Sequence, residues 1–484
     1  MNKARERGVA LILTMILLLM LSVMAVSLMF VSQTETWSGM NYRLMSQARD
    51  GAEAGVHMAA NYLMFNYTPP GGAGDPLNNY VLTASPVTYS GNPVVLSANS
   101  NVSSNYPASS AQDGFHGAAQ GGLTASNTTV NYATSATLLS MQQVIPYGST
   151  TPVTIQSWLI TSDGNINRIR NAQVEVSAIL ERPITPVFSY AAFATSNGCA
   201  ALTFGGGGST DSYDSGTVVN GAVTTQASNG NVGTNGNLTT GGSQTTINGT
   251  LSTPRAGVGG CSSNNVTAWT DNQGKVTGGM VELPQPINYP NPTIPPPGTT
   301  DLSLSKNWSC PTGANAIPGC SSSGGDITIP PGSYGNIAIS GQANLHLSAG
   351  TYNINSLSEQ SAGSGIIIDS GPVILNVAGN GITGTVVQLT GNSVQNPSLV
   401  PTNFQILYAG TGNVKLAGQS QASGLLYAPN ASFSFTGGGN WYGAVIGQTL
   451  LDMGGAAIHY DRRLKDTAFT VGNYMLSSFT WKKY

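Results

Sequence analysis

The sequence predicts a mainly β protein that begins with one long α-helix. Three observations carry this prediction: an apolar run at residues 9–31, a helical pattern that continues to about residue 66, and short β-branched segments between glycine and asparagine turns over most of the remaining chain. Charged residues make up only 8% of the 484 residues and glycine occurs 61 times, whereas an ordinary soluble domain carries about 25% charged residues. The expected order is a transmembrane helix, a small β-sheet head and a parallel β-solenoid.

The overall charge excludes one class of partner. The formal net charge is −3, so no basic surface draws the chain to nucleic acid. Hydrophobic residues make up 40% of the chain, which is enough to build a core and argues against intrinsic disorder.

The N-terminal stretch has the pattern of a membrane-spanning helix. No charged residue lies between Gly8 and Glu35, and about 20 apolar residues in a helix span a bilayer. A secretory signal would have a shorter apolar core followed by small residues at a cleavage site. The positive-inside rule places the N-terminus in the cytoplasm, because the basic residues Lys3, Arg5 and Arg7 precede the run.

The helical pattern continues beyond the apolar run. Its apolar residues recur at three- and four-residue steps from Met40 to Ala59, and no proline occurs before Pro69. A helix from residue 9 to residue 66 would be about 87 Å long. Small residues allow close approach of helices, and the candidates for such packing are Gly39, Gly51, Ala52 and Gly55.

These features together resemble the PilX-type minor pilins of type IV pili. The resemblance lies in a short basic leader that ends in Gly8, an apolar helix directly after it, and the segment QARDGAEAG at 47–55. It implies that a prepilin peptidase cuts between Gly8 and Val9. The alternative is an ordinary signal anchor with a helical stalk. Leu13 stands where major pilins carry a glutamate, which fits a subunit at the tip or in an initiation complex.

The chain divides into six predicted segments. Short, even strands between turn residues favour a parallel β-solenoid after the head, with a β-sandwich as the alternative. The stretch 420–464, with LYAPNA, YGAVIG and IHYD, resembles a C-terminal β-solenoid domain found behind PilX-type N-termini. The segments are a leader at 1–8, the transmembrane and pilin-like helix at 9–66, a small β-rich pilin-like head at 67–185, a Gly/Asn-rich β-solenoid at 186–281, a Pro-rich linker at 282–298, and a C-terminal β-solenoid with its cap at 299–484.

Four cysteines are disulfide candidates, because an exported chain folds in an oxidising compartment. Cys310 and Cys320 bracket a Pro/Gly loop that one disulfide can close, and the other candidates are Cys199 and Cys261. No CxxC pair supports a zinc or thioredoxin-like site. Burial as free, small hydrophobic residues is the alternative.

The remaining motifs indicate turns and not catalysis. Residues 379–384 fit GxGxxG, but a strand-like segment follows where a nucleotide site needs a helix. The segment TFGGGGST at 203–210 has no phosphate-loop lysine. A capping turn is expected at His459 and Asp461, and a loop turn at Asp211 and Asp214, because neither pair has a third ligand at a useful spacing.

Two aromatic segments are expected to close the ends of the solenoid, although both have residues that stack on sugars or partner surfaces. They are NWYG at 440–443 and FTWKKY at 479–484.

The predicted function is structural and not enzymatic. We expect a minor pilin-like component of a type IV pilus or related pseudopilus, at the tip or in initiation, that presents its solenoid for adhesion. The expected partners are other pilins and minor pilins, the prepilin peptidase, the inner membrane, and surface glycans or host or abiotic surfaces, with no nucleic acid, cofactor or metal. The protein would cross the inner membrane once, with its C-terminal part periplasmic or extracellular, and reach the pilus or cell surface after assembly. The alternatives are a membrane-anchored β-solenoid adhesin unrelated to pili and a β-solenoid enzyme acting on polysaccharide.

Overall fold

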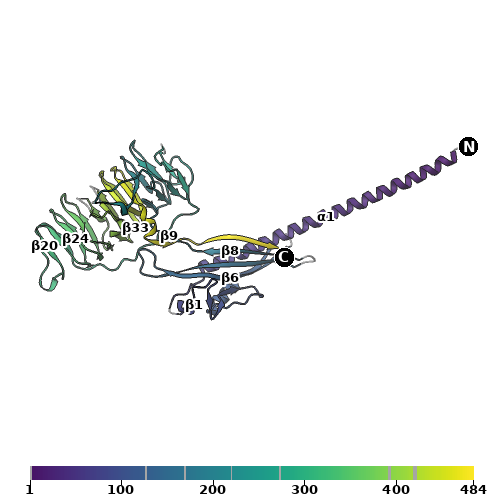
Figure 1. Ribbon diagram of the computed structural model, residues 1–484, viewed down its shortest axis with the longest axis horizontal. Coiled ribbons are helices and arrows are strands. Elements are labelled where there is room, and N and C mark those ends of the chain that lie inside the picture. Colours follow the sequence, from purple (N-terminus) through teal and green to yellow (C-terminus); the bar gives the residue numbers. More distant parts are fainter. Residues whose placement is uncertain are drawn as a thin grey trace. The chain divides into compact units, whose positions relative to one another are not determined.

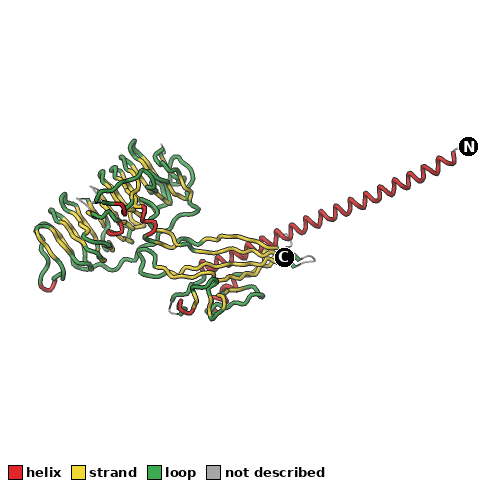
Figure 2. The backbone as a smooth tube through the Cα atoms, viewed as in Figure 1, coloured by secondary structure: helices red, strands yellow, loops and turns green. Residues whose placement is uncertain are grey.

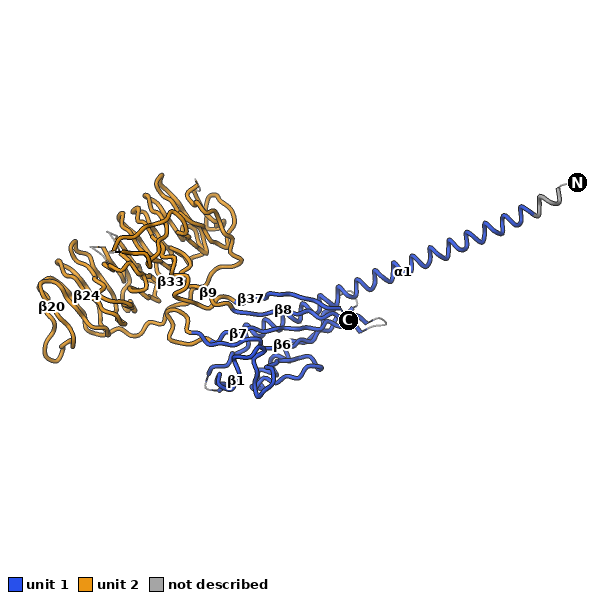
Figure 3. Tube along the Cα trace, viewed as in Figure 1, with its two compact units in different colours: residues 1–144, 154–182, 474–484 blue, residues 145–153, 183–473 orange. Residues whose placement is uncertain are grey.

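The computed structural model describes residues 3–72, 74–125, 128–167, 171–219, 221–271, 274–390, 394–417 and 422–483. The chain forms two compact units (Figure 3). Unit 1 contains residues 1–144, 154–182 and 474–484, and unit 2 contains residues 145–153 and 183–473. The predicted fold class is confirmed, because one long apolar helix is followed by mainly β structure with a large parallel sheet.

The first element is the helix α1 (Lys3–Phe65), which is 63 residues long. It contains no proline, and it ends four residues before Pro69 and Pro70, whose rings cannot continue a helix. The predicted end at residue 66 is therefore correct to within one residue. The first half of α1 stands clear of the strands of unit 1, and its last part lies along them (Figure 2).

Unit 1 is built on an antiparallel sheet with the strand order β37-β8-β7-β6-β4, and β5 pairs with β6. Its strands show the two-residue alternation of a sheet with one buried face, most clearly in β8. A separate three-stranded sheet has the order β1-β2-β3. The elements of unit 1 after α1 are η1 (Leu77–Asn79), β1 (Tyr80–Val81), β2 (Thr88–Tyr89), β3 (Asn92–Pro93), β4 (Val95–Ser97), α2 (Ser109–Ala118), β5 (Gln120–Ala125), β6 (Thr128–Val144), β7 (Val153–Ile166), β8 (Ala172–Glu181) and β37 (Met475–Lys483).

One face of α1 forms the core of unit 1. Residues spaced by four lie on the same side of a helix, and Ala48, Ala52 and Val56 are fully buried. This face packs on β6 and β8, with Leu138, Trp158 and Ile160 of the sheet in the same core cluster.

Unit 2 contains the rest of the strands, most of them three to five residues long. Its elements are β9 (Ile184–Pro186), β10 (Ala192–Ala194), β11 (Leu202–Phe204), β12 (Ser209–Tyr213), η2 (Ser215–Thr217), β13 (Val232–Thr234), β14 (Leu238–Thr240), β15 (Thr246–Ile247), β16 (Leu251–Thr253), β17 (Trp269–Thr270), β18 (Met280–Glu282), β19 (Leu302–Leu304), η3 (Gly313–Asn315), β20 (Ser321–Ser323), β21 (Asp326–Thr328), β22 (Gly332–Ser333), β23 (Asn336–Ile339), β24 (Asn344–Leu347), β25 (Gly350–Ile354), β26 (Ser356–Glu359), β27 (Gly365–Ile368), β28 (Val373–Val377), β29 (Thr385–Leu389), β30 (Val394–Gln395), η4 (Pro401–Asn403), β31 (Phe404–Tyr408), β32 (Asn413–Ala417), β33 (Ala422–Thr436), β34 (Asn440–Asp452), β35 (Ala457–Asp461), η5 (Arg462–Asp466) and β36 (Phe469–Val471).

The strands of unit 2 stack as parallel coils, the arrangement of a parallel β-solenoid (Figure 1). Each strand pairs in register with the strand one coil away, so apolar side chains stack in rows inside the coils. One row runs through Tyr352, Leu375, Ile406, Leu426, Val445, Ala192, Val232 and Leu251, each with at most 2% of its surface exposed.

The order of the coils in space differs from their order in the sequence. The chain starts in the middle with β10, β11 and β12, and adds further coils on one side up to β18. It restarts at β19 and returns coil by coil until β34 and β35 pair with β10, β11 and β12. The predicted 186–281 and 299–484 solenoids are therefore one continuous stack. Two solenoids were expected because the Pro-rich segment 282–298 interrupts the rhythm of the strands, whereas β34 pairs with β10 and joins the two parts.

The C-terminal strand β37 is a second correction. The segment 479–484 was expected to cap a solenoid, but 479–483 belong to β37, which pairs antiparallel with β8 at the edge of the unit 1 sheet; Tyr484 lies outside the described residues. The physical reason is that Met475–Lys483 contains no glycine or proline to turn a coil. Its aromatic and β-favouring residues suit a longer paired strand.

Candidate functional site

The first candidate functional element is the exposed apolar half of α1. A run of 23 residues from position 9 to position 31 would be about 35 Å long as a helix, against about 30 Å for the hydrocarbon core of a bilayer. The large apolar side chains of this run are at least half exposed, among them Leu13 at 62% and Leu28 at 70%. By length and composition, α1 is thus able to cross a membrane.

The predicted cleavage pair Gly8 and Val9 lies within α1, at the start of this apolar run. The first two residues of the predicted leader lie outside the described residues. Cleavage between Gly8 and Val9 stays a prediction.

The predicted helix-packing residues have two different environments. A Cβ atom added at Gly51 would strike the side chain of Val130, and one added at Gly55 would strike Thr134 and Ser162. Ala52 is fully buried on the same face. These three small residues therefore pack α1 on its own sheet, which corrects the expectation that they pack against another helix.

Gly39 differs from these three residues. A Cβ atom added there would have no heavy atom within 4 Å. Of the four predicted packing positions, Gly39 keeps a surface that is open to a second helix.

Gly164 in β7 is a packing residue that the sequence analysis missed. A Cβ atom added there would lie 2.8 Å from the backbone nitrogen of Ala52 and closer still to the carbonyl oxygen of Ala48. The helix backbone therefore rests directly on the strand. Glycine inside a strand often marks such an approach, so the signal was present in the sequence.

A histidine cluster joins coils from distant parts of unit 2. Nδ1 of His459 in β35 lies 2.5 Å from Oδ1 of Asp211 in β12, and its Nε2 lies 3.1 Å from Oδ1 of Asn440. The ring stacks on Tyr442 with the centroids 4.5 Å apart. Both ring nitrogens are engaged, so the imidazole has no free nitrogen for catalysis or metal binding.

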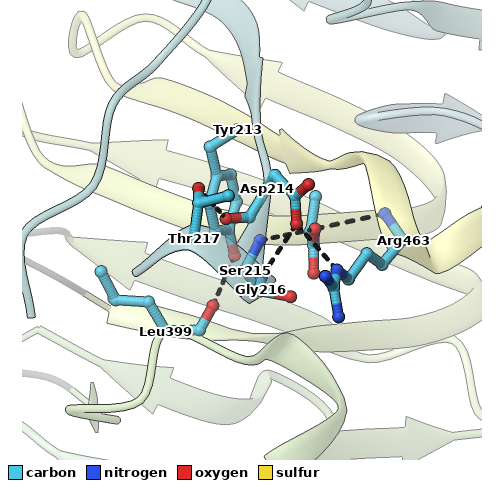
Figure 4. Close-up of polar contacts among 8 residues, drawn as sticks. Tyr213, Asp214, Ser215, Gly216, Thr217, Leu399 and Arg463 are labelled. Atoms are coloured by element: carbon cyan, nitrogen blue, oxygen red, sulfur yellow. Dashed lines mark hydrogen bonds and ion pairs between the residues drawn. The ribbon is translucent and has the colours of Figure 1, made fainter. Parts of the chain in front are cut away.

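A second polar cluster fastens the same two coils (Figure 4). Asp214 accepts hydrogen bonds from the backbone nitrogen of Gly216 at 2.9 Å and from Nε of Arg463 at 2.7 Å. These bonds, in that order, lower the pKa of Asp214. Oδ1 of Asp461 accepts from the backbone nitrogens of Ser215 and Arg463 at 3.1 and 3.2 Å, while burial raises the pKa of this carboxyl group. The cluster links the turns that follow the C-terminal ends of β12 and β35.

The turn predictions at these acids are met in part. Asp214 caps η2 and Asp461 caps η5, so both lie at turns. Asp211 and His459 instead lie inside paired strands. The turns were expected from the residues next to each side chain in the sequence, whereas Asp211 and His459 lie on two distant strands that pair with each other.

Asp452 at the end of β34 is a buried acid close to these clusters in sequence. Its Oδ1 accepts from the backbone nitrogen of Ala456 at 3.2 Å. Burial raises the pKa of Asp452 to about 6, and backbone hydrogen bonds from Ala456, Gly454 and Gly455 oppose the shift.

The other motifs form structural parts of the coils. Gly379 and Gly381 have positive φ angles in the turn after β28, and strand β29 follows, so no helix is present to bind a phosphate. Trp441 and Tyr442 of NWYG are buried in unit 2. Within the described ranges, no three His, Cys, Asp or Glu side chains are placed to hold a metal ion.

Both cysteine pairs form disulfides in unit 2. One joins Cys310 to Cys320 across ten residues, and the other joins Cys199 to Cys261 across 62 residues. The second pair links the loop after β10 to an outer coil.

The comparisons with known proteins agree with the N-terminal architecture. Residues 7–57 match the family described as PilX N-terminal, so the chain carries a PilX-type pilin N-terminal domain. Residues 313–467 match a domain of unknown function (DUF7305).

One solved structure similar to this chain is that of the competence-associated pilin ComZ from Thermus thermophilus. It is 12% identical, with 91% of this chain and 98% of that chain covered and a TM-score of 0.26. No curated protein matches the chain.

Proposed function

We propose that this protein is a minor pilin-like subunit of a type IV pilus or a related pseudopilus, at the tip or in the initiation of assembly. One observation carries the proposal: the PilX-type helix buries one face of its second half on its own sheet and leaves its apolar first half exposed. An exposed apolar helix needs lipid or other helices around it. Other pilins and minor pilins supply such helices in the assembled fibre.

The proposed role of unit 2 is adhesion, and no catalytic step is assigned to it. The protein would cross the inner membrane once, with the part of the chain after the apolar run on the periplasmic or extracellular side, because the basic residues precede that run. A prepilin peptidase would remove the leader before the protein joins the fibre and reaches the cell surface.

Mass spectrometry of the mature protein tests the pilin assignment. We expect an N-terminus at Val9 in wild-type cells and an uncut chain in cells without the prepilin peptidase. An intact Met1 in wild-type cells, or cleavage near residue 25, would refute it. Surface display that persists without the peptidase would instead favour the membrane-anchored adhesin, and cleavage of a glycan panel would favour the enzyme.

The place in the fibre is tested at Leu13. Leu13→Glu puts an acid into hydrocarbon, which costs about 2.5–3.5 kcal/mol when charged at the centre of the membrane and less near the interface. At the tip no amine from a next subunit pairs with it, so we expect less mutant protein in sheared fibres. Immunogold label along the whole length of wild-type fibres would contradict the tip position, and undiminished incorporation of the mutant would contradict the need for an apolar residue.

A further inference from the structure

A polar groove lies on unit 2 where five segments of the chain meet. Its volume is about 450 Å³. The segments are residues 195–197 after β10, Asn235 after β13, residues 286–289 of the Pro-rich segment, residues 429 and 430 of β33, and residue 448 of β34.

The walls of the groove are held in place by partly buried hydrogen bonds. The side chain of Asn235 donates to the carbonyl oxygens of Thr195 and Ile287 at 3.2 and 2.8 Å, and its Oδ1 accepts from the backbone nitrogen of Ile287 at 2.8 Å. Oγ1 of Thr195 donates to the carbonyl oxygen of Pro429 at 2.6 Å. Tyr289 packs on Phe193 with ring centroids 4.9 Å apart. The groove is thus preformed and does not depend on loop closure.

The groove offers neutral hydrogen-bonding groups. Asn197, Asn288 and Gln448 are exposed, and their side-chain amides have no hydrogen-bond partner within the described part of the chain. Each amide carries one acceptor oxygen and two donor hydrogens. The described lining contains no charged side chain and no exposed aromatic ring.

We propose that this groove binds a neutral oligosaccharide, which is the ligand class through which unit 2 would act in adhesion. Sugar hydroxyl groups donate and accept hydrogen bonds, as the amides do. An anionic ligand would find no cation in the lining, because the guanidinium group of Arg255 beside it donates to the backbone carbonyl oxygens of Asn197 at 3.0 Å and Asn235 at 3.5 Å. A peptide that binds by strand addition would need an open strand edge, but β10 pairs with β13 and β34, and β34 pairs with β33 and β10. The adhesive role rests on the proposed function, whereas the binding itself does not.

The test uses the purified full chain in detergent micelles and an array of neutral oligosaccharides, anionic oligosaccharides and peptides. We expect binding to neutral oligosaccharides that the double variant Asn288→Ala/Gln448→Ala weakens at least tenfold. Asn288→Trp should abolish binding by filling the groove. Asn315→Ala and Gln244→Ala change exposed amides outside the groove and should leave affinity within twofold of wild type.

Binding to anionic oligosaccharides alone or to peptides alone would overturn the proposal, as would no binding at all. Neutral-oligosaccharide binding that survives Asn288→Trp would place the site elsewhere. Melting temperatures of the variants show whether each one still folds. A wild-type chain that binds sugar but never enters fibres would refute the pilus role and support the sugar-binding groove. A wild-type chain that enters fibres but binds no sugar would support the pilus role and refute the sugar-binding groove.

Discussion

Replacing Gly164 by alanine should loosen α1 from its sheet without changing a charged or exposed group. The new Cβ atom would lie 2.8 Å from the backbone nitrogen of Ala52 and closer to the carbonyl oxygen of Ala48. Both are atoms of a regular helix, so neither can rotate away as a side chain can. The helix must therefore move off β7 by about 1.5 Å or more before the carbonyl oxygen of Ala48 reaches ordinary contact distance.

The loss in the free energy of unfolding follows from the buried contacts between α1 and the sheet that this movement separates. A gap of about 0.5–1 Å forfeits a quarter to a half of each contact's attraction, and Ala48, Ala52 and Val56 are fully buried on this face. Overpacking of a core adds about 1–3 kcal/mol of strain, and the stiffer unfolded chain returns about 0.4–1 kcal/mol. We expect the free energy of unfolding of unit 1 to fall by about 2–3 kcal/mol.

Amide hydrogen exchange of the full chain, followed in peptides from β7 and β8, measures this change within unit 1. A loss of 2 kcal/mol corresponds to exchange about 30-fold faster. Gly39→Ala is the matched control, because its Cβ atom meets nothing within 4 Å and alanine favours a helix by about 0.5–1 kcal/mol. Exchange of Gly164→Ala within twofold of wild type would refute the contact between helix and strand backbones.

Three further changes test other parts of the chain. Gly39→Leu should reduce incorporation into fibres while unit 1 stays folded, since close helix approach needs a small residue; immunoblots of sheared fibres measure this. Burial raises the pKa of Asp452 from 3.8 to about 6 in the folded state, so the folded state binds this proton more tightly than the unfolded state. The free energy of unfolding should therefore fall by about 2–3 kcal/mol as pH rises from about 4 to about 6. Asp452→Asn should remove this pH dependence in thermal unfolding. Cys199→Ser should destabilise unit 2 by about 4 kcal/mol and Cys310→Ser by about 3 kcal/mol, because the first bridge closes the longer loop; denaturant unfolding gives both values.

Local sequence patterns predicted the helices and strands of this fold, but they did not predict which distant strands pair with each other. The end of α1 followed from periodicity and Pro69, and the coils followed from short strands between turn residues. The pairing of Ala192 with Val445 was not predictable in the same way, because any apolar rung can stack on any other in a parallel solenoid. The same limit hid the contact between Asp211 and His459, whose strands lie almost 250 residues apart in the sequence.

The central position of β10 in the coil stack has a consequence for folding kinetics. Its partner β34 comes about 250 residues later in the chain, so this pairing has high contact order and is slow to form. Until β34 and β35 arrive, the edges of β10, β11 and β12 on that side are open to other chains. If the part of the chain after the apolar run crosses the membrane in sequence order, these edges stay exposed for most of its passage. We therefore expect unit 2 to be most prone to aggregation just before its last coil closes the stack.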